Sequence, residues 1–486
     1  MSAILCICLF ATLLLPTCVH GQTLPDNPSL ERLPALGLDE GPLGSEIASP
    51  SQIGREFVEP PPVPASTAPR WVDSMPITDE CAEPYTLDLL LTLACENNPT
   101  LRQAQLHITA ELAKAQQAGL YPNPVASYVA EQIGLAGTAG EWQGAEVEQR
   151  FVTAGKLTLS RSKYHQRARV AEHLAVAQQF RVCNDVRVHF YRSLAALEIL
   201  DLHRELVKTA EDHVLTVREM YNLGQANRAE AHQANAMLQR QRLKLMKAEN
   251  EVRKQVVELT ALVGLDMVNP LLAGSLDLEG DPIDFEAAYA RIIQCSPELL
   301  AAYTKLREDA ITLERESVEW VPDIVVSGGA GYNHVDQQTS AAARVSIEIP
   351  LFDRNQGTIN QAQADYARQR NEIRRTRLDL RRRLGTEYER YLTAYQHVLE
   401  YQSVILPAKQ EAYRISLESY RDNRAEWPDV LNTQEDYTQA RIENIMQQAD
   451  LHVSESLIDG YLLHGGLETP RGPVPDGHID SVPKPR

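Results

Sequence analysis

The chain is poor in aromatic residues and in long hydrophobic runs, and each shortage excludes a class of protein. Phe, Trp and Tyr make up 6% of the 486 residues, and only 25 residues are glycine, which excludes a collagen. The only long apolar run lies at residues 3–15, too short for the ~20 residues of a membrane-spanning helix. A polytopic helical membrane protein is therefore excluded, whereas the 43% hydrophobic content is enough for a substantial core.

Basic residues and enzyme motifs are also scarce. There are 47 Lys and Arg residues against 66 Asp and Glu, a net charge of −19, which argues against a nucleic-acid partner. The sequence contains no HExxH, GxSxG, P-loop or CxxC motif, and its 13 histidines are scattered. We therefore expect no enzyme and no catalytic, cofactor-binding or metal site.

The apolar run at residues 3–15 has the length of a signal-peptide core. Small residues before Gln22 suit a cleavage site, so residues 1–21 are predicted to be a signal peptide and the mature protein to be exported. Cys18 follows Leu15-Pro16-Thr17, a weak version of a lipoprotein acylation box, and its lipidation stays open.

Four cysteines follow the signal peptide: Cys81, Cys95, Cys183 and Cys295. In an oxidising compartment Cys81 and Cys95 could form a disulfide. Unpaired cysteines buried in helices are at least as good an interpretation for Cys183 and Cys295.

Between two proline-rich ends the chain repeats itself. Residues 22–84 hold 12 of the 28 prolines and are predicted to be a disordered leader, and residues 465–486 a disordered tail. Asn98-Pro99-Thr100-Leu101 corresponds to Ser296-Pro297-Glu298-Leu299, and Glu219-Met220-Tyr221 to Glu418-Ser419-Tyr420. This nearly constant offset indicates two repeats, residues 85–283 and 284–464.

Each repeat changes its apolar period in the same order. A helix comes first, at residues 99–119 in the first repeat, and a β-hairpin follows, at residues 124–152 and 323–351. In the last strand Val345 and Ile347 alternate with Arg344 and Ser346, which is period two. Two long helices then follow each hairpin, at residues 157–222 and 228–264, and at residues 357–420 and 428–464, where Pro407 should kink the rod. The fold class is mainly α, with long antiparallel helical hairpins and four strands.

Strands with one apolar face suit a transmembrane barrel, but four strands cannot close one. Because open edges are not tolerated in lipid, several copies would have to share one barrel. Three copies would give twelve strands, with the helices forming a tube beyond the membrane. The alternative is a soluble hairpin that caps a helical bundle.

The sequence resembles the TolC-like outer-membrane efflux proteins, in particular the CzcC-like branch that serves cation-efflux pumps. The resemblance covers about residues 85–464 and is carried by a set of motifs in both halves: Asn98-Pro99-Thr100-Leu101, Leu120-Tyr121-Pro122-Asn123-Pro124, Phe151-Val152-Thr153-Ala154-Gly155-Lys156-Leu157 and Ile349-Pro350-Leu351-Phe352-Asp353-Arg354-Asn355. It implies a homotrimer with a shared barrel in the outer-membrane lipid and a periplasmic helical tunnel. It also implies two partners, a periplasmic adaptor (membrane fusion) protein and an inner-membrane pump of the resistance-nodulation-division type. The exported solutes implied by the CzcC-like branch are metal cations.

The resemblance also places the periplasmic tip, where each helical hairpin turns at a Tyr-x-x-Gly motif. The implied adaptor-docking residues are Tyr221, Leu223, Gly224, Tyr420, Asp422 and Asn423, where Asn423 stands in place of the second glycine. Asn227 and Glu230 have the spacing of a helix cap.

An implied pore gate follows the second turn. It comprises Asp429, Asn432, Glu230, Tyr420 and Arg424. Asn432 stands where relatives carry a second acid, and Ala425 where they carry an arginine. The alternative for Asp429 is a carboxylate that only stabilises the first turn of its helix. For the whole chain the alternative is a periplasmic coiled-coil adaptor or scaffold without a pore.

Overall fold

A computed structural model describes residues 84–131, 133, 141–265, 267, 270–278, 280, 282–422, 424–474 and 478–480. The predicted signal peptide, Cys18, Cys81, Asn423 and the leader up to residue 83 lie outside the described residues.

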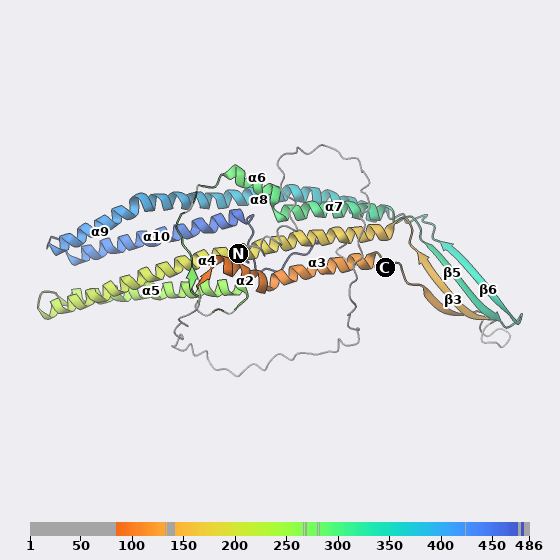
Figure 1. The fold of residues 1–486 in the computed structure, drawn as a ribbon, viewed down its shortest axis with the longest axis horizontal. Helices are drawn as coiled ribbons and strands as arrows, with labels where there is room; N and C mark the ends of the chain where they lie inside the picture. Colours follow the sequence, from red (N-terminus) through yellow and green to blue (C-terminus); the bar gives the residue numbers. More distant parts are fainter. Residues whose placement is uncertain are drawn as a thin grey trace, which may run out of the picture. The chain divides into compact units, whose positions relative to one another are not determined.

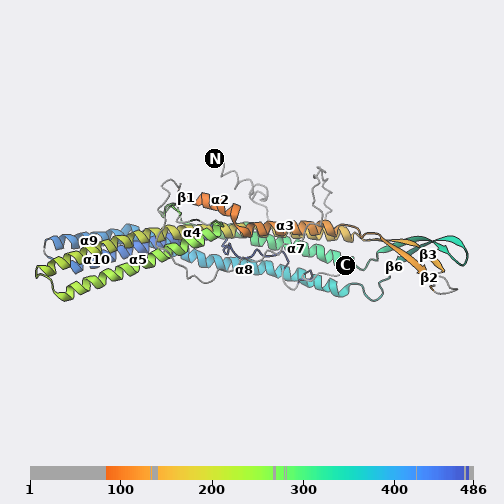
Figure 2. The ribbon, with the colours of Figure 1, turned by 90° about the horizontal axis from the view of Figure 1, so that it is seen from below.

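The first half runs from a short strand to a very long helical hairpin. Its elements are β1 (Tyr85–Thr86), α2 (Leu87–Asn97), α3 (Pro99–Ala118), β2 (Val125–Glu131), β3 (Trp142–Phe151), α4 (Lys156–Asn222) and α5 (Arg228–Val263). The 67 residues of α4 make a rod of about 100 Å. Figure 1 shows α4 and α5 side by side, with the strands beyond the opposite end of α4 from the α4–α5 turn, and Figure 2 agrees.

The second half repeats this order after the short strand β4 (Leu272–Ala273). Its elements are α6 (Phe285–Cys295), α7 (Pro297–Ser317), β5 (Ile324–Asn333), β6 (Gln338–Ile347), α8 (Gln356–Glu400), the π-helix η3 (Tyr401–Ile405), α9 (Leu406–Arg421) and α10 (Trp427–Asp459). Because Pro407 lacks an N–H, it cannot continue the α-helical ladder, and the chain adjusts through the π-turn directly before it. The rod continues through Pro407.

Caps explain where the shorter helices begin. The Asn98 side chain accepts a hydrogen bond from the Thr100 N–H at 2.9 Å, and Pro99 occupies the first turn of α3, where a missing N–H costs nothing. In the second repeat Pro297 occupies the same place in α7. The Asn-Pro and Ser-Pro motifs of the two repeats therefore mark equivalent helix starts.

The described core lies between the helices and consists of two large clusters and a small one, in which Val207 and Ala210 of α4 pack with Leu238 of α5. In the first large cluster, Phe190 and Leu194 of α4 pack with Leu90 of α2 and Leu259 of α5. The first large cluster also includes Ile442 and Ile445 of α10. In the second, Leu380, Leu384 and Tyr391 of α8 pack with Ile292 of α6 and Ile458 of α10. Tyr388 and Tyr395 pack against the second cluster.

The four longer strands form one antiparallel sheet in the order β2-β3-β5-β6. In the first predicted hairpin β3 begins at Trp142, and Gly144 belongs to the strand. In the second predicted hairpin β6 ends at Ile347 rather than at 351, because Pro350 cannot donate to a ladder.

The C-terminal end differs most from expectation. α10 ends at Asp459 rather than 464, because Tyr461 and Leu462 adopt positive φ angles of 61° and 60°. The expected disordered tail at 465–486 is wrong for His478, Ile479 and Asp480. His478 and Ile479 are buried, and the Ile479 N–H donates to the Asp365 carboxylate at 3.0 Å.

Candidate functional site

The register of the sheet gives it two chemically different faces. Paired residues of neighbouring antiparallel strands point to the same side of a sheet. The register of the four strands therefore assigns every strand residue to one of the two faces. All five charged residues in the four strands lie on one face: Glu131, Glu146, Glu148, Arg150 and Arg344. The other face carries only uncharged residues, among them Tyr128, Val147, Phe151, Ile324, Val326, Tyr332, Val345 and Ile347.

On the inner strand β5 the apolar face is the more exposed one. Along β5, Val326, Gly328 and Ala330 on the apolar face are exposed, whereas Ser327 and Gly331 on the polar face are buried. This is the inverse of a sheet in a water-soluble protein, where apolar residues pack inward. An exposed apolar face suits contact with lipid hydrocarbon.

Trp142 covers part of the polar face. Its indole Nε1 donates to the Ser340 Oγ at 3.0 Å, so the ring extends from β3 over β5 to β6. A Cβ atom on Gly331 would lie 2.4 Å from this ring, and one on Gly144 would lie 2.5 Å from it. The two glycines therefore make room for the tryptophan.

The two outer strands of the sheet, β2 and β6, are each paired on one side only in the described chain. Each leaves a row of backbone groups without a partner strand. In hydrocarbon such groups have no water to bond with, so the sheet requires a neighbouring strand on both edges.

A charged junction fixes the sheet to the helices. The Asp323 carboxylate, just before β5, accepts hydrogen bonds from the Thr153 N–H at 3.2 Å, from Lys156 Nζ at 2.9 Å and from Arg150 Nε at 2.9 Å. Ala154 and Gly155 adopt positive φ angles of 55° and 66°, which makes the sharp turn from β3 into α4. The Thr-Ala-Gly-Lys motif is thus the corner between strand and rod.

The turn between α4 and α5 is a glycine-capped helix end. Gly224 has a φ of 73°, and the Gln225 N–H donates to the Met220 carbonyl at 2.8 Å. Tyr221 and Leu223 are exposed, Leu223 by 73%. An exposed leucine at a helical tip is available to a partner protein.

The turn between α9 and α10 shares backbone hydrogen bonds with the first turn. The Arg424 N–H donates to the Ser419 carbonyl at 2.8 Å, which matches the Gln225–Met220 bond at the repeat offset. Asp422 and Arg424 are exposed and form an ion pair with each other. Both predicted tip turns therefore form, at the same end of the described helices (Figure 1).

The predicted gate residues are only partly brought together. Asp429 and Asn432 lie one turn apart on α10 and are both exposed, so they share one face. Glu230 instead completes a capping box with Asn227, accepting from its N–H at 3.2 Å, and no hydrogen bond joins it to Tyr420 in the described chain. Arg424 pairs with Asp422, as above, and not with Glu230.

Tyr420 has an aromatic partner that the sequence did not indicate. Its ring lies 4.9 Å from that of Trp427, and the Trp427 ring lies 5.9 Å from that of His213 on α4. His213 is buried, and burial lowers its pKa. The three rings join the second turn to the first helical hairpin.

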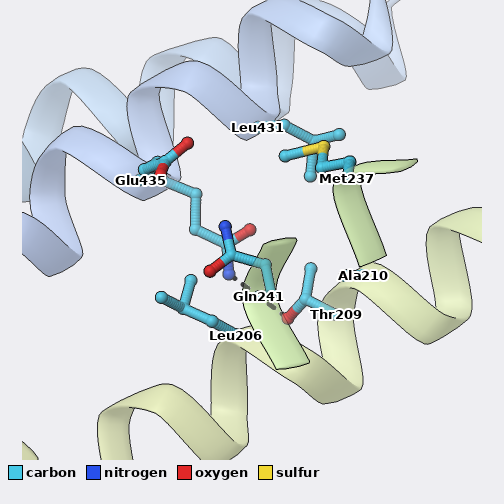
Figure 3. Close-up of a pocket in the computed structure, with 8 residues that line it drawn as sticks. Leu206, Thr209, Ala210, Met237, Gln241, Leu431 and Glu435 are labelled. Atoms are coloured by element: carbon cyan, nitrogen blue, oxygen red, sulfur yellow. Dashed lines mark hydrogen bonds between the residues drawn. The ribbon is translucent and has the colours of Figure 1, made fainter. Parts of the chain in front are cut away.

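Behind the tip, α10 packs against α4 and α5. Figure 3 shows the contact, which is lined by Leu206, Thr209 and Ala210 of α4, Met237 and Gln241 of α5, and Leu431, Gln434 and Glu435 of α10. Gln434 Nε2 donates to the Thr209 Oγ1 at 3.3 Å. Lys244 of α5 forms an ion pair with Glu435 at 2.5 Å. These contacts hold the two helical hairpins of one chain together.

A sheet with an exposed apolar face, joined to helical rods of about 100 Å, defines a channel subunit of the outer membrane. Residues 90–265 and 288–460 match the family of outer membrane efflux proteins, and the chain belongs to this family. The two matched stretches lie within the two repeats expected from the sequence. No helix in the described ranges has the length and apolar character needed to cross a bilayer.

Known relatives agree with this assignment. The chain is 25% identical over 398 residues to the cobalt-zinc-cadmium resistance protein CzcC of Cupriavidus metallidurans, covering 79% of this chain and 91% of the relative. It is 24% identical over 303 residues to the nickel-cobalt-cadmium resistance protein NccC of Alcaligenes xylosoxydans xylosoxydans, covering 61% and 67%. Its fold is similar to that of the Campylobacter jejuni CmeC outer membrane channel, with a TM-score of 0.64 at 15% identity, covering 80% of this chain and 87% of that one.

The predicted family, its CzcC-like branch and the fold class are confirmed. The chain is an outer-membrane channel component of an efflux system, with a large periplasmic part.

Proposed function

We propose that three copies of this chain form one passive conduit through the outer membrane. The observation that carries the proposal is the placement of all five strand charges on the face opposite the exposed apolar one. With β6 of one copy paired to β2 of the next, twelve strands close a barrel with charges toward water and apolar residues toward lipid. The chain itself supplies a pore and no chemical step.

The partners follow from the two tips. A periplasmic adaptor protein would dock at the α4–α5 and α9–α10 turns, through Tyr221, Leu223, Gly224, Tyr420, Asp422 and Asn423. Support comes from the exposed Leu223 and from the backbone hydrogen bonds that the two turns share. An inner-membrane pump of the resistance-nodulation-division type would supply the energy.

Asp429 and Asn432 are proposed to face the channel at its periplasmic entrance. Both are exposed on one face of α10, directly after the second tip turn. A ring of three Asp429 carboxylates would favour cations in the entrance. The latch that holds the entrance shut is proposed to be the Tyr420–Trp427 ring contact rather than a bond from Tyr420 to Glu230.

The cargo is proposed to be divalent transition-metal cations. The relatives are named for metal resistance: CzcC for cobalt, zinc and cadmium, and NccC for nickel, cobalt and cadmium. The net charge of −19 agrees with a path for cations.

Purified protein in planar lipid bilayers tests the conduit. We expect discrete current steps with preference for K⁺ over Cl⁻, and the absence of steps would contradict a pore. Deletion of the gene in its source bacterium tests the cargo separately, since the deletion should lower tolerance to Co²⁺, Zn²⁺ and Cd²⁺. Unchanged tolerance together with intact conductance would overturn the cargo and leave the conduit.

The alternative of an adaptor or scaffold without a pore has less support. In a water-soluble adaptor, a sheet with an exposed apolar face and two open edges would promote aggregation.

A further inference from the structure

Two cysteines that are far apart in the sequence lie together on packed helices. Cys95 is near the end of α2, and Cys183 is in the middle of α4. The two thiols are close enough to interact with each other. Around them α2 and α4 share the first core cluster, in which Leu91 and Ala94 pack with Val182 and Val186. The helices that carry the thiols are therefore held in place by their own packing.

The two thiols differ in their access to solvent. Cys95 is exposed, whereas Cys183 is half-buried against the core cluster. The interaction with Cys183, with a smaller contribution from Gln179, lowers the pKa of Cys95 to about 7 against the opposing effect of burial. The same interaction and burial raise the pKa of Cys183. Cys95 is thus the accessible thiolate, and Cys183 is placed to react second.

We propose that Cys95 and Cys183 form a disulfide in the mature protein, which joins α2 to α4. The proposal depends on the periplasmic position of the helices and not on the channel's cargo or partners. Disulfides form and persist in the bacterial periplasm, whereas thiols in the cytosol stay reduced. A bond between residues 95 and 183 closes a loop that includes α3, β2 and β3, and a long loop gives a large entropic stabilisation.

The oxidant is a disulfide of a periplasmic thiol–disulfide oxidoreductase. The Cys95 thiolate attacks one sulfur of that disulfide, forming a mixed disulfide and releasing the other sulfur as a thiolate. Cys183 then loses its proton to the released thiolate and attacks the Cys95 sulfur, which expels the second sulfur of the oxidant. Two thiols of the channel are oxidised, one disulfide of the oxidant is reduced to two thiols, and the protons are retained by the oxidant.

Peptide mapping of the full protein tests the pairing without any mutation. The protein is extracted from outer membranes, its free thiols are blocked with iodoacetamide, and it is digested without reductant. Trypsin cleaves after Arg102, Arg181 and Arg187, and cleavage before Asp88 and Asp185 with an Asp-specific protease separates Cys81 from Cys95. We expect a cross-linked peptide of 88–102 with 182–184. Iodoacetamide on both thiols, or Cys95 linked to Cys81 or to a second chain, would overturn the proposal.

Thermal unfolding in detergent gives an independent readout. We expect a reductant to lower the unfolding temperature of the natural protein by about 5 °C. The Cys95→Ser/Cys183→Ser double variant should unfold at the lower temperature with or without the reductant. Cys295→Ser is the matched control, because Cys295 ends α6 as Cys95 lies near the end of α2, and this variant should keep the full response. A natural protein that does not respond to the reductant would contradict a stabilising disulfide.

Discussion

Arg167 and Asp480 lie 2.6 Å apart, Nη2 to carboxylate oxygen, and join the first turns of α4 to the C-terminal segment. Arg167 also pairs with Glu308 of α7 at 2.6 Å, and Lys305 bridges Glu308 and Asp309. All of these side chains are largely buried. The cluster therefore ties both repeats and the end of the chain into one network.

This cluster predicts that stability falls at acid pH. The neighbouring Lys163 and Arg167 lower the pKa of Asp480 to about 2 against the opposing effect of burial, and the pKa of Asp309 is also lowered. Because the folded protein favours the charged carboxylate, its contribution is complete above the unfolded pKa of about 4 and is lost as the pH falls toward 2. The unfolding temperature in detergent should decrease over this window.

The Asp480→Asn variant checks the assignment. It should unfold at a lower temperature at neutral pH and show a weaker decrease between pH 4 and 2. Breaking one partner of a buried ion pair costs roughly 3–5 kcal/mol. A variant with the stability and acid profile of the natural protein would contradict the role of the cluster.

Much of the fold could be predicted from local pattern. The helices expected at 157–222 and 228–264 are observed at Lys156–Asn222 and Arg228–Val263, because the Gly224 and Asn227 caps act within one turn of the chain. The alternation around Val345 identified the two faces of β6 correctly. Its end was missed, because Ile349 and Leu351 continue the pattern beyond Pro350 although the ladder cannot.

The contacts that could not be predicted join distant residues. His478 and Asp480 are near the C terminus, and no local sequence pattern shows that they contact Asp309 of α7 and Arg167 of α4. The Cys95–Cys183 contact is of the same kind. For the candidate entrance, both tip turns could be predicted, but the Tyr420–Trp427 contact could not, since two aromatic residues near a turn do not specify which rings meet.

The two faces of β6 predict that the same substitution has different effects on membrane insertion. Ala342 lies on the polar face and Ala343 on the apolar face, and both are exposed. Ala343→Arg should reduce the amount of protein in the outer membrane, because an arginine facing lipid at mid-depth costs roughly 2–4 kcal/mol. Ala342→Arg should insert normally. Quantitative blotting of outer-membrane fractions measures both, and equal insertion would contradict the assignment of faces.

Two glycines predict opposite changes in stability. Gly264 has a φ of 78°, and a Cβ there would lie 2.8 Å from the Asn97 carbonyl oxygen. Gly264→Ala should therefore lower the free energy of unfolding by more than about 1 kcal/mol. Gly385 lies inside α8 with open space around it, so Gly385→Ala should raise it by about 0.5–1 kcal/mol. Denaturant unfolding of both variants distinguishes them, and a stabilising Gly264→Ala would contradict the positive-φ requirement.

The entrance predicts a change in current. Asp429→Ala should raise the conductance at low voltage and weaken the cation preference, because it removes a ring of charge and bulk from the entrance. Asp459→Ala, at the far end of α10, is the control and should leave both properties unchanged. Bilayer recordings measure both variants. A current in Asp429→Ala identical to that of the natural protein would remove Asp429 from the gate.

The central claim is that the four strands of one chain share a membrane barrel with other copies. Single-particle imaging of the detergent-extracted protein, with the mass determined on the same sample, tests it most directly. The account predicts a threefold particle with one twelve-stranded barrel and a helical tube of about 100 Å. A monomer or dimer released from membranes without detergent would contradict it.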